Sequence, residues 1–175
     1  VGSEMCIRDR IMALILHLQP VDFEKMSLPL GAWILFRLLA SFCGVFGFSV
    51  MFNSPVRLAA VAAGIGAVAN TFRLELVDLT ACPPAAAAFM GALAAGLLAS
   101  LIKSRVGYPR ISVTVPSIVI MVPGLYLYRG FYNLGMMSLS ASASWFASAI
   151  LIVAALPLGL IFARILTDKT FRYCT

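Results

Sequence analysis

The sequence predicts an all-α fold, a polytopic transmembrane helix bundle of about five spans whose fourth segment is broken by prolines. The 175 residues are 62% hydrophobic and only 11% charged, with a mean hydropathy of +1.00. An ordinary soluble domain is about 45–50% apolar and about 25% charged, and one core of this size cannot bury so much apolar surface. The apolar runs are too uniform for barrel strands, which alternate in units of about ten residues. Composition therefore excludes a soluble domain, and the high hydrophobicity excludes a disordered chain.

Short regions flank the predicted transmembrane domain. Residues 1–10, VGSEMCIRDR, resemble a translated sequencing adapter and are interpreted as a non-native artefact. Residues 11–27 contain an apolar stretch that is too short to span a membrane, followed by charges, and predict an interfacial segment. The transmembrane domain then covers residues 28–166, and residues 167–175 are expected to form a cytoplasmic tail.

Each span is justified by an apolar run and by what ends it. The first run ends at Asn53-Ser54-Pro55, where asparagine and proline favour a turn. The second is rich in alanine and glycine, which permit close helix contact in a bilayer. After it, the charged segment Phe72–Pro84 is expected to be a loop, one that could begin as a helical extension. The predicted spans are Leu28–Phe52, Val56–Thr71, Ala85–Ile102, Ile111–Leu134 and Ala143–Leu166.

The fourth segment carries the most information, because it contains VTVPSIVIMVPGLYLYRGFYNLG. A proline removes a backbone donor and obstructs the preceding helical turn. Pro116 and Pro123, the latter followed by Gly124, therefore predict a broken or unwound helix that either crosses or re-enters the membrane. Transporters use such discontinuous helices to present helix ends and free carbonyls to substrates and ions. The alternative is a kinked helix with a structural role only.

The basic residues predict an orientation for five spans. One side holds more of them than the other, and basic residues favour the cytoplasmic side. We therefore expect an N-terminus outside, a cytoplasmic C-terminus and a location in the plasma (inner) membrane of a bacterium. The richer side would hold Arg57, Lys103, Arg105, Arg110, Arg164, Lys169 and Arg172, and the other side Lys25, Arg73 and Arg129.

Arg37 is the charged residue within the first predicted span. An arginine at the centre of a membrane helix costs about 2.5–3.5 kcal/mol on insertion scales. It is a candidate contact for a substrate carboxylate or an ion. Alternatively, it snorkels to the interface or is paired inside the protein, and Glu75 and Asp78 are then the expected counter-charges.

The other candidate residues of a substrate or ion path each have a structural alternative. Asn53 ends the first span, and Asn70 and Arg73 end the second, so each is either a helix-terminating residue or a gate group. Ser117 could donate to a carboxylate or satisfy backbone groups freed by Pro116. Tyr128 fits an interfacial aromatic belt, and Arg129 fits a snorkelling arginine. The full set of candidates is Arg37, Asn53, Arg73, Pro116, Ser117, Pro123, Gly124, Tyr128 and Arg129.

Catalytic, metal and nucleic-acid motifs are missing from the sequence. It has no HExxH and no phosphate-binding glycine loop, and its one histidine, His17, precedes the predicted spans. The four cysteines are isolated, without metal-ligand spacing. Basic and aromatic residues are not interleaved on a polar segment, as a nucleic-acid module requires. We therefore expect no enzymatic activity, no metal, no cofactor and no nucleic-acid partner.

Three segments together resemble the threonine/serine exporter family, in particular its small five-helix membrane subunit. They are FGFSVMFNSPVR at 46–57, NTFR at 70–73 and TVPSIVIMVPGLYLYRGFYNLG at 114–135. The resemblance implies a subunit of a secondary transporter that exports threonine and serine, or dicarboxylates such as succinate. It also implies a larger membrane subunit of the same family as partner, or self-association, and a small anionic or zwitterionic substrate. The alternative function is a non-transporting scaffold or accessory subunit; the small residues Gly64, Gly66, Gly96 and Ser100 predict helix association in either case.

Overall fold

The computed structural model describes residues 29–80, 82–107 and 109–168, and all its regular elements there are helices. They are α2 (Leu30–Met51), α3 (Val56–Thr80), α4 (Pro84–Val106), α5 (Arg110–Val119), α6 (Gly124–Gly135) and α7 (Leu139–Thr167). The interpretations of residues 1–10 and 11–27, His17 and nearly all of the predicted tail lie outside the described residues.

The helix lengths confirm a bundle of about five spans. Four helices, α2, α3, α4 and α7, are each long and apolar enough to cross a membrane, and α5 with α6 makes a fifth candidate bent by 41°. The predicted break is therefore present, but the two prolines contribute differently. Pro116 lies inside α5, where its missing N–H costs one bond to the carbonyl of Ser112. Pro123 follows the non-helical residues and caps the start of α6.

The segment Phe72–Pro84 was expected to be mostly loop, and this expectation is wrong. Helix α3 continues through it to Thr80, so the alternative of a helical extension describes nearly the whole segment. The charges that argued for a loop are accommodated on the helix, since Glu75 and Asp78 both pair with Arg37 of α2. The following prolines start α4, where the missing N–H of Pro84 falls among the donors that have no helical partner.

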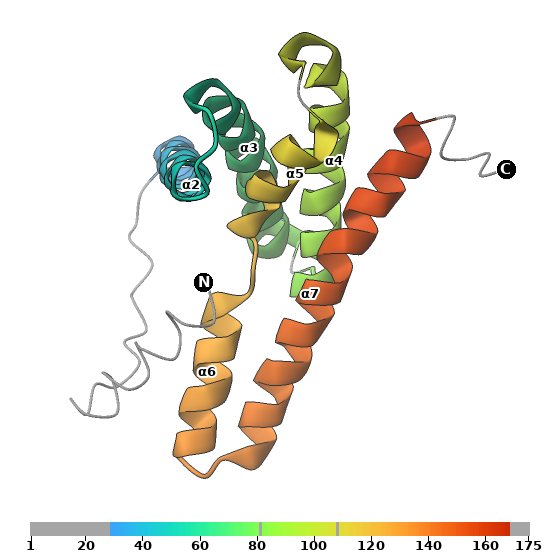
Figure 1. Cartoon of the computed structure of the whole chain (residues 1–175). Coiled ribbons are helices and arrows are strands. Elements are labelled where there is room, and N and C mark those ends of the chain that lie inside the picture. Colours follow the sequence, from blue (N-terminus) through green and yellow to red (C-terminus); the bar gives the residue numbers. More distant parts are fainter. Residues whose placement is uncertain (1–28, 81, 108, 169–175) are drawn as a thin grey trace, which may run out of the picture.

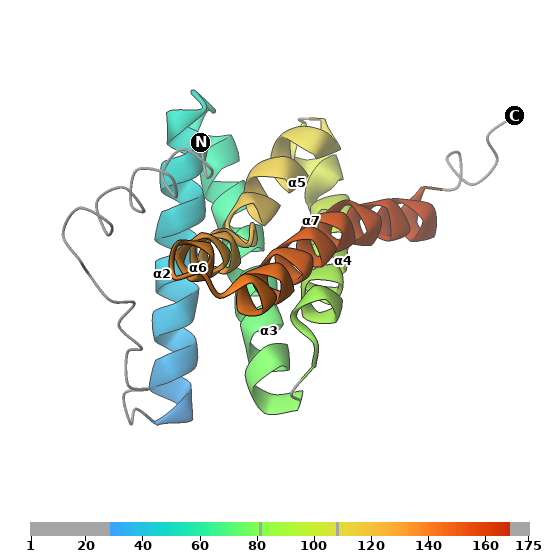
Figure 2. The same ribbon diagram turned by 90° about the horizontal axis from the view of Figure 1, so that it is seen from below.

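Helix α2 crosses the α6–α7 hairpin steeply. Figure 1 views α2 almost end-on while α6 and α7 run along the page; Figure 2 views α6 end-on and shows α2 at full length. The α6–α7 hairpin extends beyond the cluster formed by α2, α3, α4 and α5, and α7 joins the two groups by packing on both α4 and α6. Within the hairpin, the buried Ser142 hydroxyl donates to the carbonyl oxygen of Gly130 at 2.7 Å.

Small residues allow α5 to lie deep among its neighbours. A Cβ atom on Gly66 of α3 would lie 2.9 Å from the carbonyl oxygen of Ser117, and one on Gly44 of α2 would lie 2.9 Å from Ile120 Cδ1. Gly96 serves the α4–α7 contact in the same way, since a Cβ there would lie 2.5 Å from Ala163 Cβ. The faces around Gly66 and Gly96 thus associate helices inside the chain, whereas a Cβ on Gly64 would meet nothing within 4 Å.

Candidate functional site

The candidate site is the break between α5 and α6, where an arginine meets a free helix end. Met121 lies in this break with its side chain fully buried, and its carbonyl oxygen accepts a hydrogen bond from Arg73 Nη1 of α3 at 2.9 Å. The last carbonyls of a helix have no helical partner and carry a partial negative charge. The guanidinium of Arg73 therefore complements the end of α5 at a point inside the predicted membrane span.

Polar atoms without partners gather on the same turn of α3. Among the described residues, Asn70 Oδ1, Thr71 Oγ1 and Arg73 Nε are buried and make no hydrogen bond. Asn70 and Arg73 are three residues apart and share a helix face. Each such atom costs about 1–3 kcal/mol compared with a paired one. The turn thus offers an unused N–H donor and an unused amide oxygen next to the broken helix.

The neighbours hold this turn in place. The amide nitrogen Nδ2 of Asn70 donates to Ser41 Oγ of α2 at 2.9 Å, with both residues buried. Helix α4 approaches closely because it has a glycine at the contact: a Cβ on Gly91 would lie 3.0 Å from Arg73 Cβ and 3.3 Å from Met121 Sδ. The polar turn is therefore enclosed by α2, α4 and the break, and has little freedom to rearrange.

Ser117 lies on the face of α5 that packs against α3. Its buried hydroxyl is 2.7 Å from the carbonyl oxygen of Val113 and 3.0 Å from that of Ala62 on α3. Its single proton is shared between these two acceptors. Of the two alternatives for Ser117, the geometry matches the satisfaction of backbone carbonyls, and it links α5 to α3 across the predicted membrane interior.

Arg37 is paired inside the protein. Its Nη1 donates to Glu75 Oε1 at 2.9 Å, its Nη2 donates to Asp78 Oδ2, and its guanidinium carbon lies 4.8 Å from the ring centroid of Trp33. The predicted counter-charges are confirmed. Two carboxylates and an aromatic face surround one guanidinium whose side chain is 13% exposed.

The remaining candidates lie at or away from the break. Pro123 is buried at the start of α6, and Gly124 is its first residue. Asn53 forms the α2–α3 turn with a positive φ of 56°, and it lines a cavity of about 470 Å³ together with Pro116. On α6, Tyr128 stacks on Tyr132, with centroids 6.5 Å apart, and Arg129 lies 5.0 Å from the Trp145 centroid. The structure thus places Arg73, Pro123 and Gly124 at the break and Ser117 earlier on α5, and it leaves Arg37, Asn53, Pro116, Tyr128 and Arg129 elsewhere.

Sequence reasoning missed three parts of this site. The Ser41–Asn70 bond, the unpartnered Thr71 hydroxyl and the Met121 carbonyl were not among the candidates. The sequence did contain a signal for Asn70 and Thr71, because Asn70, Thr71 and Arg73 interrupt a long run of alanine, glycine and valine. A carbonyl oxygen leaves no such trace in a sequence.

Comparison with known protein families decides the assignment. A family model described as "Threonine/Serine exporter, ThrE" matches residues 37–166, which include all of the break and the turn around Arg73. The chain belongs to the threonine/serine exporter family. Neither a curated protein nor a solved structure matches it. This exporter-family chain is a multi-pass membrane protein and a transporter component.

Proposed function

We propose that this chain is the small subunit of a secondary exporter of threonine and serine, and that it works with a larger membrane subunit of the same family. The family is one of transporters, and discontinuous helices at the centre of the membrane are where secondary transporters bind substrates and ions. In this proposal the chain is not an enzyme. It resides in the inner membrane of a bacterium, with its N-terminus outside and its C-terminus in the cytoplasm.

The observation that carries the proposal is the set of unused polar atoms beside the break. Arg73 Nε is a donor for a carboxylate, while Asn70 Oδ1 is an acceptor for an ammonium or hydroxyl group. Threonine and serine carry all three groups. Their binding would satisfy atoms that are otherwise buried without partners, so the cost of desolvating those atoms would be recovered when substrate binds.

A dicarboxylate such as succinate fits this turn less well. A second carboxylate would call for a second cation, and among the described residues that make hydrogen bonds at the break, Arg73 is the charged one. The amide oxygen of Asn70 would face a carboxylate oxygen without a proton between them. The site chemistry therefore favours amino acids over dicarboxylates.

The test is efflux of radiolabelled threonine from cells that lack their own exporters. Cells would express this chain, the larger subunit, or both, at membrane levels matched by immunoblot. Efflux that requires both chains supports the two-subunit exporter. Full efflux with the larger subunit alone would replace the proposal with the scaffold function. Faster export of succinate than of threonine would overturn the substrate assignment.

A further inference from the structure

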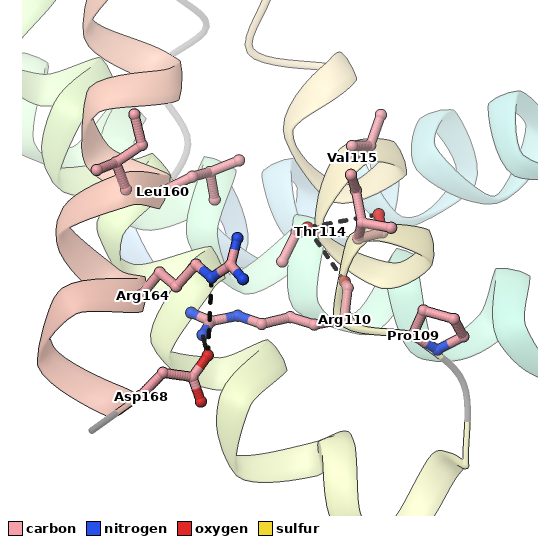
Figure 3. A pocket seen from close by; sticks show the side chains of 9 residues that line it. Pro109, Arg110, Thr114, Val115, Leu160, Arg164 and Asp168 are labelled. Carbon is pink, nitrogen blue, oxygen red and sulfur yellow. Dashed lines mark hydrogen bonds and ion pairs between the residues drawn. The ribbon is translucent and has the colours of Figure 1, made fainter. Parts of the chain in front are cut away.

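A second polar site lies at the N-terminal end of α5, opposite the end of that helix that leads into the break. A cavity of about 580 Å³ separates the first turns of α5 from the last turns of α7. Figure 3 shows Arg110, Arg164 and Asp168 meeting at one end of this cavity, with Val115 and Leu160 on the facing helices beyond them. The cavity is therefore charged at one end and apolar along its length.

Arg110 holds the charged end together. Its Nη2 donates to the carbonyl oxygen of Gly96 at 2.8 Å, and its Nη1 donates to Thr167 Oγ1 at 2.9 Å. Asp168 Oδ2 lies 3.6 Å from Arg110 Nη1 and 3.8 Å from Arg164 Nε. Both distances exceed that of a hydrogen bond, so Asp168 pairs loosely with both guanidinium groups. The charged side chains that line this end are two arginines and one aspartate, which sum to a charge of +1.

The apolar side chains that line the cavity are partly exposed. Ile111 is 68% exposed, and Val115 and Ile161 are each 46% exposed, although all three line the cavity. A small polar solute gains nothing from such a wall. A hydrocarbon chain gains about 0.8 kcal/mol for each CH₂ group that it buries. The opening lies between α5 and α7, two helices of the predicted membrane spans, and exposes apolar side chains of both.

We propose that this cavity binds an anionic phospholipid. The phosphate group contacts Arg110 and Arg164, and one acyl chain lies along Ile111, Val115, Leu160 and Ile161. Arginine binds phosphate through charge-assisted hydrogen bonds, and basic pockets between membrane helices accommodate anionic headgroups. Helix α5 packs on α2, α3 and α4, so the lipid would extend its support to α7 and hold the broken span in place. This inference does not depend on the substrate that the exporter carries.

The test measures binding of single lipids to the full chain in detergent by native mass spectrometry. The probes are dioleoyl phosphatidylglycerol, dioleoyl phosphatidylcholine, inorganic phosphate and threonine. We expect phosphatidylglycerol to bind more tightly than phosphatidylcholine. Arg164→Gln should weaken phosphatidylglycerol binding by about fivefold, the value for one basic residue near an anionic lipid. Ile161→Trp should weaken it by blocking the acyl wall while every charge remains.

Two variants serve as matched controls. Arg57→Gln removes an exposed basic residue outside the cavity, and Ile150→Trp enlarges an exposed residue of α7 that does not line it. Both should bind phosphatidylglycerol as the original chain does. Equal binding of the two lipids, unchanged binding by Arg164→Gln, or unchanged binding by Ile161→Trp would each overturn the proposal. Phosphate or threonine binding as tight as that of phosphatidylglycerol would assign the cavity to small solutes instead.

Discussion

Arg37 on α2 and Arg73 on α3 are both arginines inside predicted spans, yet their surroundings are opposite. Arg37 has two carboxylates and a tryptophan ring around it. Arg73 makes no ion pair among the described residues; it donates to one carbonyl oxygen and keeps a buried N–H unused. A charged residue in a membrane helix is costly, and in the first case two ion pairs and an aromatic contact offset that cost.

In the proposed function, this difference separates a structural arginine from a binding one. Two carboxylates already offset the charge of Arg37, so it attracts an anionic substrate weakly, whereas an arginine that contacts only a helix end can still receive an anion. The same contrast explains why Glu75 and Asp78 stay helical: both pair with Arg37 across the contact between α2 and α3. Four experiments on stability test this contrast, in order of expected effect.

The largest effect is expected for Arg37→Met. The substitution removes the cation that pairs with Glu75 and Asp78. Breaking a buried charge pair typically costs 3–5 kcal/mol, and this cluster is only partly buried, so we expect a loss of about 3 kcal/mol. The measurement is the free energy of unfolding in detergent micelles. The triple variant Arg37→Met/Glu75→Gln/Asp78→Asn should recover most of the loss, because it removes the two carboxylate charges as well. A single variant as stable as the original chain would refute the structural role.

Gly91→Ala should have the next largest effect, because its Cβ would press on Arg73 and Met121. Overpacking of this kind typically costs about 1–3 kcal/mol, measured as the same free energy of unfolding. Gly64→Ala is the matched control, since nothing lies within 4 Å of its Cβ. It should be neutral or stabilising by up to about 1 kcal/mol. Equal effects at the two glycines would mean that the turn around Arg73 is loosely packed.

Arg73→Gln should be milder than Arg37→Met. It removes one hydrogen bond to the carbonyl of Met121 and one buried N–H that has no partner, so the net cost is about 1 kcal/mol. Thermal unfolding of Arg73→Gln and Arg37→Met side by side checks the order. A larger loss for Arg73→Gln would make Arg73 the main structural arginine.

Ser41→Ala should have the smallest effect. It removes the acceptor for Asn70 Nδ2, and hydrogen bonds between membrane helices contribute about 0.6 kcal/mol on average. Ser49→Ala is a comparable change on the same helix, where the hydroxyl donates only to the carbonyl of Val45 within α2. Ser41→Ala should destabilise the chain more than Ser49→Ala in chemical denaturation. The reverse order would mean that Asn70 is held by other contacts.

The sequence predicted those features that are local or that arise from charge. Apolar length predicted the spans, Pro123 predicted the break, and the cost of Arg37 pointed directly to Glu75 and Asp78. These predictions succeeded because a buried charge must find a partner and a proline must interrupt a helix.

The contacts within the candidate site could not be predicted from the sequence. Which carbonyl Arg73 reaches depends on the 41° bend at the break and on the close approach of α4 at Gly91. Both are properties of the packed helices. The end of α3 was misplaced because charges in an apolar sequence indicate a loop unless their partner is known to lie on the adjacent helix.

The most direct test compares threonine efflux by two variants that lose charged side chains. Each is expressed with the proposed larger subunit, and its efflux is normalised to its amount in the membrane. Arg73→Gln should lower efflux at least tenfold, since a hydrogen bond to a charged group contributes about 1.5–3 kcal/mol. The triple variant Arg37→Met/Glu75→Gln/Asp78→Asn should keep efflux within about twofold, because it removes the arginine together with both of its carboxylate partners. Retained efflux by Arg73→Gln, or lost efflux by a folded triple variant, would contradict the assignment of the substrate site to the break.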